Sequence, residues 1–267
     1  MATQLLFYEK AVPVSAKKHA KLCVKAGESY SFASKVNSVP LTAAEFAEAG
    51  AEYPVVFAGE GENIIPTAIL GVAGESNAFV SEEGGWSGRY IPAFIRRYPF
   101  VFSQQTEDNQ LVLHIDESFE GCNTKGRGER LFDSDGAQTQ YLKNVLAFLQ
   151  DYQARFTRSQ AFCKRLVDLD LLRPMQAQFT LPDSGTRSLT GFMTVDREKL
   201  KALDAETLTA MMSTDELECV FLHLASLRHF GQVAERAAGQ NGDGLLSDGS
   251  GDASDDSAGP ETEKQDA

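Results

Sequence analysis

Residues 86–102 read Trp86-Ser87-Gly88-Arg89-Tyr90-Ile91-Pro92-Ala93-Phe94-Ile95-Arg96-Arg97-Tyr98-Pro99-Phe100-Val101-Phe102. These 17 residues contain eight aromatic or proline rings and three arginines. Pro92 and Pro99 exclude one uninterrupted helix, because proline lacks the amide hydrogen that a helix interior uses. The rings can bury a large apolar area, whereas guanidinium groups are buried only beside partners. We call this segment the ring-rich stretch, and it predicts a tightly packed corner of the fold.

The ring-rich stretch is also the best candidate for a ligand site. Arg89, Arg96 and Arg97 would supply bidentate recognition of an anionic or aromatic ligand, for example a peptide or a carbohydrate-linked group. Trp86 and Tyr90 would supply a stacking surface. The alternative interpretation is structural, with the guanidinium groups paired with acids and stacked on the rings of a packed corner. Both interpretations stay open at this point.

The first half of the chain has the pattern of antiparallel strands. Residues 53–58 and 64–70 flank a Gly-rich connection, which is typical of a β-hairpin. Pro66 is expected to keep the second strand at an edge or a bulge, because it has no amide hydrogen for a neighbouring strand. Residues 78–80 and 111–115 are further strand candidates. Since short connections favour antiparallel pairing, the simplest arrangement is a meander over about residues 50–120.

The second half has the pattern of helices. From residue 137 to 156 and on to Leu172, apolar residues recur at steps of three and four, which predicts a long helix ending before Pro174. Residues 176–194 predict a hairpin whose turn contains Pro182-Asp183-Ser184-Gly185. Ser213 and Glu216 have the spacing of a capping box and predict a helix over about 214–237.

Together these patterns predict an α+β fold. An antiparallel, β-rich N-terminal half, about residues 1–130, would pack against helices and one hairpin at about 137–238. We expect one domain over residues 1–238. Residues 239–267 contain eight acidic residues and one lysine, with little to bury. Because such a segment cannot offset its ordering entropy, we expect a disordered acidic tail.

Composition limits the possible functions. The 267 residues are 42% hydrophobic, which suffices for a full core, and the formal net charge of −13 gives no basic footprint for a nucleic acid. No run of about 18 apolar residues occurs, and the N-terminus lacks the pattern of a secretion signal, so we expect no membrane span and no leader. Four well-separated cysteines suit a reducing compartment. We therefore expect a cytoplasmic location, with the cell surface as the alternative.

Nine segments agree in order and spacing with one protein family: residues 7–14, 37–41, 53–57, 86–102, 115–117, 131–133, 148–150, 174–177 and 191–192. In these segments, which span about residues 5–237, the chain resembles the SapC family of bacterial proteins. The resemblance implies a link to bacterial surface layers, and to gene clusters for outer-membrane nutrient receptors and flavin-dependent halogenase-like enzymes. It supplies neither an established activity nor a set of catalytic residues.

Catalytic motifs are weak. His114 and Asp116 lie on one face of a predicted strand and could bind iron with a distant histidine such as His223 or His229. A lone histidine in a strand is more often simply hydrogen-bonded, so we expect no metal. Residues 121–128 resemble a phosphate-binding loop, but Arg127 and Gly128 stand where that loop needs Lys and Ser or Thr.

The sequence therefore favours a binding protein. We expect a SapC-like protein that binds a protein or small-molecule partner without catalysis and without a cofactor, in a bacterial surface or nutrient-uptake setting. The first alternative is a metal-dependent enzyme or enzyme accessory that uses His114 and Asp116. The second alternative is a structural component of a surface layer. No catalytic residue is identified, and the sequence specifies neither the partner nor the oligomeric state.

Overall fold

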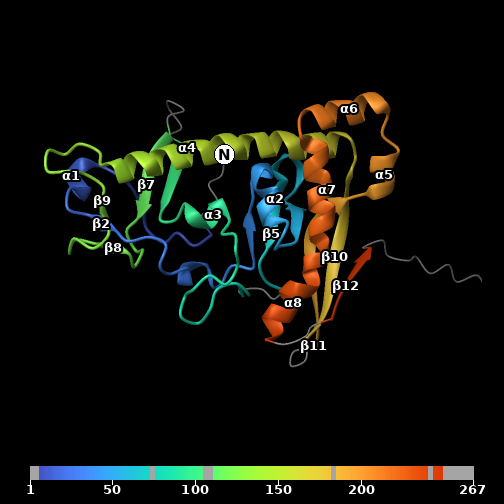
Figure 1. Cartoon of the computed structure of the whole chain (residues 1–267), viewed down its shortest axis with the longest axis horizontal. Coiled ribbons are helices and arrows are strands. Elements are labelled where there is room, and N and C mark those ends of the chain that lie inside the picture. Colours follow the sequence, from blue (N-terminus) through green and yellow to red (C-terminus); the bar gives the residue numbers. More distant parts are fainter. Residues whose placement is uncertain (1–5, 73–75, 105–110, 182–184, 240–242, 249–267) are drawn as a thin grey trace, which may run out of the picture.

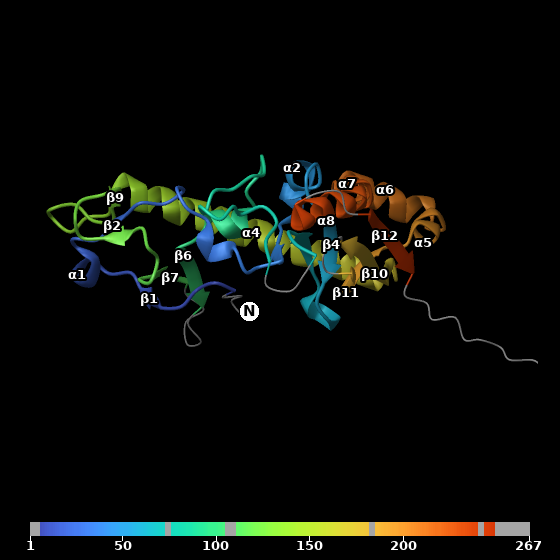
Figure 2. The ribbon, with the colours of Figure 1, turned by 90° about the horizontal axis from the view of Figure 1, so that it is seen from below.

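The fold is organised along one long helix, α4 (Gln140–Asp168). The computed structural model describes residues 6–72, 76–104, 111–181, 185–239 and 243–248. Within them α4 runs along the longest axis of the molecule, and the sheets and shorter helices lie along it (Figures 1 and 2). The sheets are antiparallel and helices dominate the C-terminal half, so the predicted α+β class is confirmed.

Helix α4 confirms the long helix that the apolar spacing predicted. It begins where the Thr139 hydroxyl accepts the amide of Leu142 at 3.3 Å, which satisfies one of the free amides of the first turn. Near its N-terminus Leu142 and Leu149 pack into one apolar cluster, and further along Phe162 and Leu166 pack into a second. One helix thereby joins the two cores.

The larger sheet has six strands in the order β12-β10-β11-β4-β5-β3. Their bounds are β3 (Ser38–Pro40), β4 (Val55–Ala58), β5 (Ile65–Ile69), β10 (Leu172–Leu181), β11 (Gly185–Val195) and β12 (Asp243–Asp248). Strands β4 and β5 are the predicted first hairpin, and β10 and β11 the predicted second one. The two hairpins join where Phe57 of β4 pairs with Met193 of β11.

Three expectations for the first half were wrong in detail. Pro66 lies in β5, an interior strand, where its carbonyl accepts the amide of Leu41 just beyond the end of β3. Residues 78–80 form no strand, since Val80 makes only an isolated bridge to Trp86. The single meander over 50–120 is instead divided between two sheets, because β5 ends at Ile69 and the next strand, β6, begins at Phe100 near the end of the ring-rich stretch and pairs in another sheet.

Two small sheets complete the other end of the molecule. The first has the order β1-β7-β6, with β1 (Ala11–Pro13), β6 (Phe100–Gln104) and β7 (Leu111–Asp116). The second has the order β8-β2-β9, with β2 (Cys23–Val24), β8 (Cys122–Asn123) and β9 (Glu129–Arg130). The predicted strand at 111–115 is thus confirmed as β7. Phe7 and Phe32 pack against both apolar clusters and lie where the two cores meet.

Short helices surround these sheets. They are α1 (Ala16–His19), α2 (Phe46–Ala49), α3 (Ala93–Arg96), α5 (Arg197–Lys201), α6 (Ala205–Ser213), α7 (Glu216–Ser226) and α8 (Phe230–Ala238). The helix predicted over 214–237 is broken by a 3₁₀ turn at Leu227–His229. The predicted capping box was also wrong, because Ser213 ends α6 and Asp215, at φ 61°, precedes α7. The Glu216 carboxylate pairs instead with Arg165 at 2.8 Å.

A buried histidine connects α7 to the larger sheet. His223 Nδ1 donates to the carbonyl of Val55 at 2.6 Å, and its Nε2 accepts the amide of Val195 at 3.0 Å. The Ser226 hydroxyl accepts the amide of Val55 at 2.9 Å. Both side chains are fully buried. The helix therefore satisfies backbone groups of β4 and β11 at the point where the two hairpins meet.

The predicted disordered acidic tail, residues 239–267, falls largely outside the described residues. Within it the backbone of β12 pairs antiparallel with β10, and residues 249–267 lie outside the described part.

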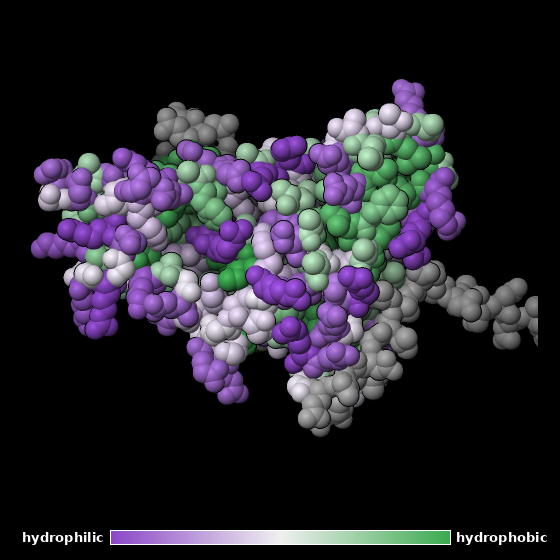
Figure 3. Space-filling model, viewed as in Figure 1, coloured by the Kyte–Doolittle hydropathy of each residue, from purple (hydrophilic) through white to green (hydrophobic). Residues whose placement is uncertain are grey.

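The surface has an exposed hydrophobic region on this side of the molecule. Figure 3 shows hydrophobic surface near α6 and α7, where Met212 and Phe221 are 66% and 54% exposed. Among the described residues, no helix combines the length and apolar character needed to cross a membrane.

Candidate ligand-binding site

The ring-rich stretch forms a loop, helix α3, a cis Tyr98–Pro99 bond and strand β6. Its loop is held by an acidic side chain. The Glu52 carboxylate accepts the amide of Arg89 at 2.8 and 2.9 Å and the amide of Tyr90 at 3.0 Å. These charge-assisted bonds fix the loop backbone and leave the Arg89 side chain exposed.

A second carboxylate holds the start of α3. Glu45 is 4% exposed, and one of its oxygens accepts the amide and hydroxyl of Thr42 at 2.8 and 2.9 Å. The other oxygen accepts the Tyr90 hydroxyl at 2.8 Å and the amide of Ala93 at 2.7 Å. All four partners are donors, which suits an ionised carboxylate. Glu45 therefore ties the ring-rich stretch to the residues that precede α2.

Trp86, the one tryptophan of the chain, is packed as part of this corner. Its Nε1 donates to the Tyr90 carbonyl at 3.2 Å and lies 3.3 Å from the Tyr53 hydroxyl, which itself donates to that carbonyl. Its ring stacks on Phe79 with centroids 6.1 Å apart. These contacts use the indole for packing, as the structural interpretation expects.

The other two arginines of the predicted site point in different directions. Arg96 is exposed, donates from Nε to the Ile91 carbonyl at 2.9 Å and lies 5.6 Å over the Tyr90 ring. Arg97 is buried, with its guanidinium 4.0 Å from the centroid of the Phe94 ring. The predicted residues thus share a corner without converging on one ligand position.

A cavity lies next to this corner, at the junction of the two cores. Its volume is about 550 Å³, within the range typical of small-molecule sites. We call it the aromatic cavity, and none of the five predicted residues lines it. Its lining residues are Leu6, Phe7, Tyr8, Glu9, Ser31, Phe32, Lys35, Val36, Tyr98, Ser118, Phe119 and Glu120.

Tyr98, near the end of the ring-rich stretch, is the centre of the ring cluster in this wall. Its ring centroid lies 4.2 Å from that of Phe32, and 5.2 Å from those of Phe7 and Phe119. Tyr8 contacts the same ring at 5.1 Å. Aromatic pairs at these separations attract one another beyond their area burial, so the wall is a rigid apolar surface.

Asp116, at the end of β7, holds the wall in place from behind. Its fully buried carboxylate accepts the amides of Glu9, Lys10 and Ser118 at 2.7, 3.0 and 3.0 Å. It also accepts the hydroxyls of Ser118 at 2.6 Å and Tyr98 at 3.5 Å. Burial alone would raise the pKa of Asp116, but the hydrogen bonds from Ser118, Glu9 and Lys10 outweigh it and lower that pKa.

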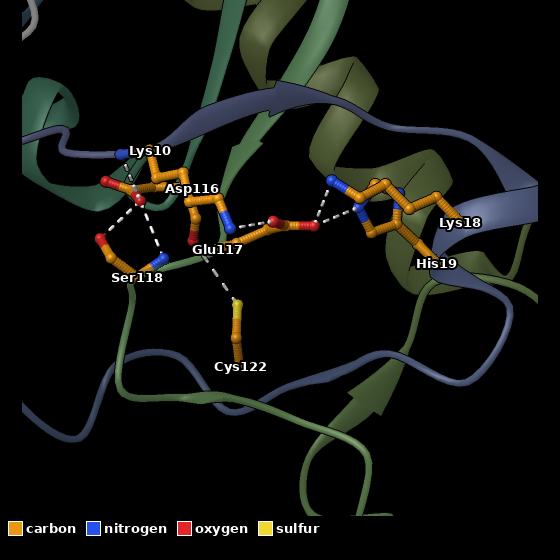
Figure 4. A network of polar contacts seen from close by, with 7 residues as sticks. All are labelled: Lys10, Lys18, His19, Asp116, Glu117, Ser118 and Cys122. Atoms are coloured by element: carbon orange, nitrogen blue, oxygen red, sulfur yellow. Dashed lines mark hydrogen bonds and ion pairs between the residues drawn. The ribbon is translucent and has the colours of Figure 1, made fainter.

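Glu117 forms the adjoining ionic network that Figure 4 shows. Its carboxylate pairs with Lys18 at 2.7 Å, Lys10 at 3.1 Å and His19 Nε2 at 3.3 Å. Bonds from Lys18 and Lys10 lower the pKa of Glu117 to about 2. Because His19 Nδ1 accepts the amide of Ser15 at 3.1 Å, its hydrogen lies on Nε2 and points at Glu117. The network fixes α1 against the end of β7.

The candidate metal ligands do not meet. His114 Nδ1 lies 3.2 Å from the Ser103 hydroxyl and 3.1 Å from the Val112 carbonyl, whereas both oxygens of Asp116 accept hydrogen bonds behind the cavity. His223 lies in the sheet junction, and His229 Nδ1 lies 2.8 Å from Gln232 Oε1. In the described part of the chain, no group of three or more His, Cys, Asp or Glu side chains is placed to hold a metal ion.

The Cys122 thiol donates to the carbonyl of Asp116 at 3.7 Å. Burial, followed by the charges of Asp116 and Glu117, raises its pKa to about 11. A neutral thiol is a poor nucleophile, so Cys122 acts as a packing residue here.

Sequence reasoning missed the aromatic cavity. Of its rings only Tyr98 belongs to the ring-rich stretch, and Phe7, Phe32 and Phe119 come from segments far apart in the chain. No short motif joins them. The available signals were the nearby segments 7–14 and 115–117, which the family resemblance had marked without assigning them a role.

The family model named SapC matches residues 14–233, which is most of the chain. The match includes the lining residues of the aromatic cavity from Ser31 to Glu120, whereas Leu6, Phe7, Tyr8 and Glu9 precede it. No curated protein and no solved structure matches the chain.

Proposed function

Since the chain belongs to the SapC family, we propose that it is a binding protein that holds a small molecule in the aromatic cavity. The setting we propose is the bacterial surface or nutrient-uptake system that the family resemblance implies. The observation that carries this proposal is the cavity itself. Its volume of about 550 Å³ lies within the range of ligand pockets, and it combines five aromatic rings with five polar or charged side chains, namely Glu9, Ser31, Lys35, Ser118 and Glu120.

The two acidic side chains behind the cavity wall, Asp116 and Glu117, support binding rather than chemistry. General acid–base catalysis needs a group that can exchange a proton with the reacting atom. The Asp116 oxygens accept hydrogen bonds from protein donors, and the Glu117 carboxylate forms ion pairs with Lys10 and Lys18. These side chains build the wall. The cavity is therefore suited to recognising a molecule and keeping it.

The proposal is tested by asking whether the cavity holds what the protein carries in its cells. Ser31 lines the cavity and is exposed, so Ser31→Tyr would fill the cavity with little effect on the core. Ser34, three residues later, is also exposed but does not line the cavity. Ser34→Tyr is therefore a matched control for the added ring.

The protein and both variants would be isolated from native cells and analysed by mass spectrometry, first intact and then denatured. We expect the natural chain and Ser34→Tyr to release the same small molecule in stoichiometric amount, and Ser31→Tyr to release little of it. Circular dichroism would confirm that all three fold. Equal retention by both variants, or no bound molecule in any sample, would contradict the proposal.

A further inference from the structure

We infer that the aromatic cavity takes an organic monocation, with an apolar ring or chain against the protein rings and an ammonium group at the mouth. This inference rests on the proposed function, because it specifies the ligand of that same site. Four features lead to it, namely the hydroxyl groups in the wall, the charges at the mouth, the buried charge of Asp116 and the rings.

Three hydroxyl groups of the wall donate their hydrogens to the protein, and the fourth, that of Ser31, shares a hydrogen bond with the Ser29 hydroxyl at 3.0 Å. Tyr8 donates to the Phe100 carbonyl at 2.8 Å, Tyr98 to Asp116 at 3.5 Å and Ser118 to Asp116 at 2.6 Å. What these groups still offer a ligand is acceptor lone pairs. An anionic ligand would find no hydroxyl donor among them and would lose its water without compensation. A ligand with N–H groups would find an acceptor in the exposed Ser118 hydroxyl, which lines the cavity.

The mouth carries more negative than positive charge. Glu9 and Glu120 line it together with Lys35, and all three residues are exposed. Within the described residues, none of these three side chains forms an ion pair. Two carboxylates against one ammonium favour a cationic group over an anionic one. Because the three are exposed, each contributes modestly and the preference should weaken as salt rises.

Asp116 adds a buried negative charge behind the ring cluster. Burial, and then the charge of Asp116, raise the pKa of Tyr98, whose ring faces the cavity. The opposing charge is Arg97, which lies 5.8 Å from the Tyr8 ring centroid inside the core and does not line the cavity. Arg97 therefore offsets part of the field of Asp116 without offering an anion-binding group to a ligand.

The rings themselves favour a cation. The negative face of a Tyr or Phe ring attracts an ammonium group within about 6 Å of its centroid. Phe32, Tyr98 and Phe119 line the cavity and contact one another, with Phe32 tilted 31° to Tyr98 and Phe119 at 81° to it, so a cation in the cavity would lie beside several rings. The exposed arginines Arg89 and Arg96 do not line this cavity. They therefore provide no guanidinium group that could bind an anionic ligand there.

Three probes of nearly equal size test the charge preference: phenethylamine, phenethyl alcohol and hydrocinnamate. Their binding to the full chain would be measured by isothermal titration calorimetry at low and at high salt. We expect phenethylamine to bind about tenfold more tightly than the alcohol, with hydrocinnamate weakest. Raising the salt should reduce only the advantage of the amine.

The double variant Glu9→Gln/Glu120→Gln should bring the amine to within about threefold of the alcohol and leave alcohol binding unchanged. The matched control is Glu206→Gln/Glu218→Gln, which removes the same charge from exposed positions on α6 and α7. It should leave all three affinities unchanged.

Each contrary outcome is distinct. If hydrocinnamate binds most tightly, or if the three probes bind equally, the assigned charge is wrong, while the proposed function stands. If no probe binds, the assigned ligand class is wrong. The comparison of Ser34→Tyr with Ser31→Tyr then decides independently whether the cavity is a binding site, because only a binding site would lose its native molecule in Ser31→Tyr alone.

Discussion

The carboxylate of Asp116 accepts the backbone amide of Glu9 at 2.7 Å, although 107 residues separate them in sequence. The next amide, that of Lys10, reaches the same carboxylate at 3.0 Å. One buried side chain at the end of β7 thus holds the N-terminal segment that forms a wall of the aromatic cavity. The stability of the fold and the shape of the cavity therefore depend on the same contact.

Replacing Asp116 should test this dependence. Asp116→Asn keeps the size of the side chain but places an NH₂ group against the amide hydrogens of Glu9, Lys10 or Ser118. We expect a loss of about 3 kcal/mol in the free energy of unfolding, since charge-assisted bonds to buried donors are broken. Chemical denaturation would measure the loss. The exposed Glu9→Gln is the control, and a loss below about 0.5 kcal/mol in Asp116→Asn would show that the carboxylate is dispensable.

Glu45 should be equally sensitive at the ring-rich stretch. All four hydrogen-bond partners of Glu45 are donors. In Glu45→Gln the side-chain NH₂ group would replace one acceptor oxygen, so at least one donor would lose its acceptor. We expect a loss of about 2 to 3 kcal/mol in the free energy of unfolding. Glu48→Gln, an exposed change in α2, should lose almost nothing. Equal losses in the two variants would mean that the buried bonds do not stabilise this corner.

The two adjacent arginines should respond differently to lysine. Arg97 is buried with its planar group stacked on Phe94, whereas Arg96 is exposed. Because lysine cannot stack in this way, Arg97→Lys should lose about 2 kcal/mol of stability and Arg96→Lys less than about 1 kcal/mol. Thermal and urea unfolding of the two variants would measure the difference. A larger loss in Arg96→Lys would contradict the packing described for this corner.

His223 predicts a specific pH dependence. Burial lowers its pKa to about 4 in the folded chain, from 6.5 as the ordinary value. Between these two values the unfolded chain binds a proton that the folded chain does not. The contribution of His223 is therefore complete above pH 6.5 and is lost as the pH falls toward 4, by about 3 kcal/mol in total.

Urea unfolding across this range, for the natural chain and for His223→Gln, would isolate that contribution. The variant should be less stable at pH 7 and should lose less stability on acidification, because carboxylates titrate in both proteins and His223 in only one. Parallel stability curves for the two proteins would rule out the assigned protonation state.

Local patterns predicted the elements that depend on local physics. The spacing of apolar residues was enough for α4, and turn residues were enough for both hairpins, because these signals act over a few residues. The break between α7 and α8 was not visible in the sequence, and the contacts of His223 and Ser226 with β4, which lie at the end of α7, were not visible either. Those contacts join residues about 170 positions apart.

The candidate site shows the same limit. The ring-rich stretch was identified as a packed corner, but the acids that hold it, Glu45 and Glu52, carry no motif. The aromatic cavity combines residues near 7, 32, 98 and 119, and only the tertiary fold brings them together. Sequence placed the arginines in a common site, whereas burial separates Arg97 from Arg89 and Arg96.

The most direct test of the account is to map where phenethylamine binds by amide chemical-shift changes in the full chain. We predict saturable changes concentrated at residues 31–36, at Tyr98 and at 118–120, with the loop at 86–92 little affected. Changes confined to that loop and to Arg96, or no saturable change anywhere, would contradict the claim that the aromatic cavity is the binding site.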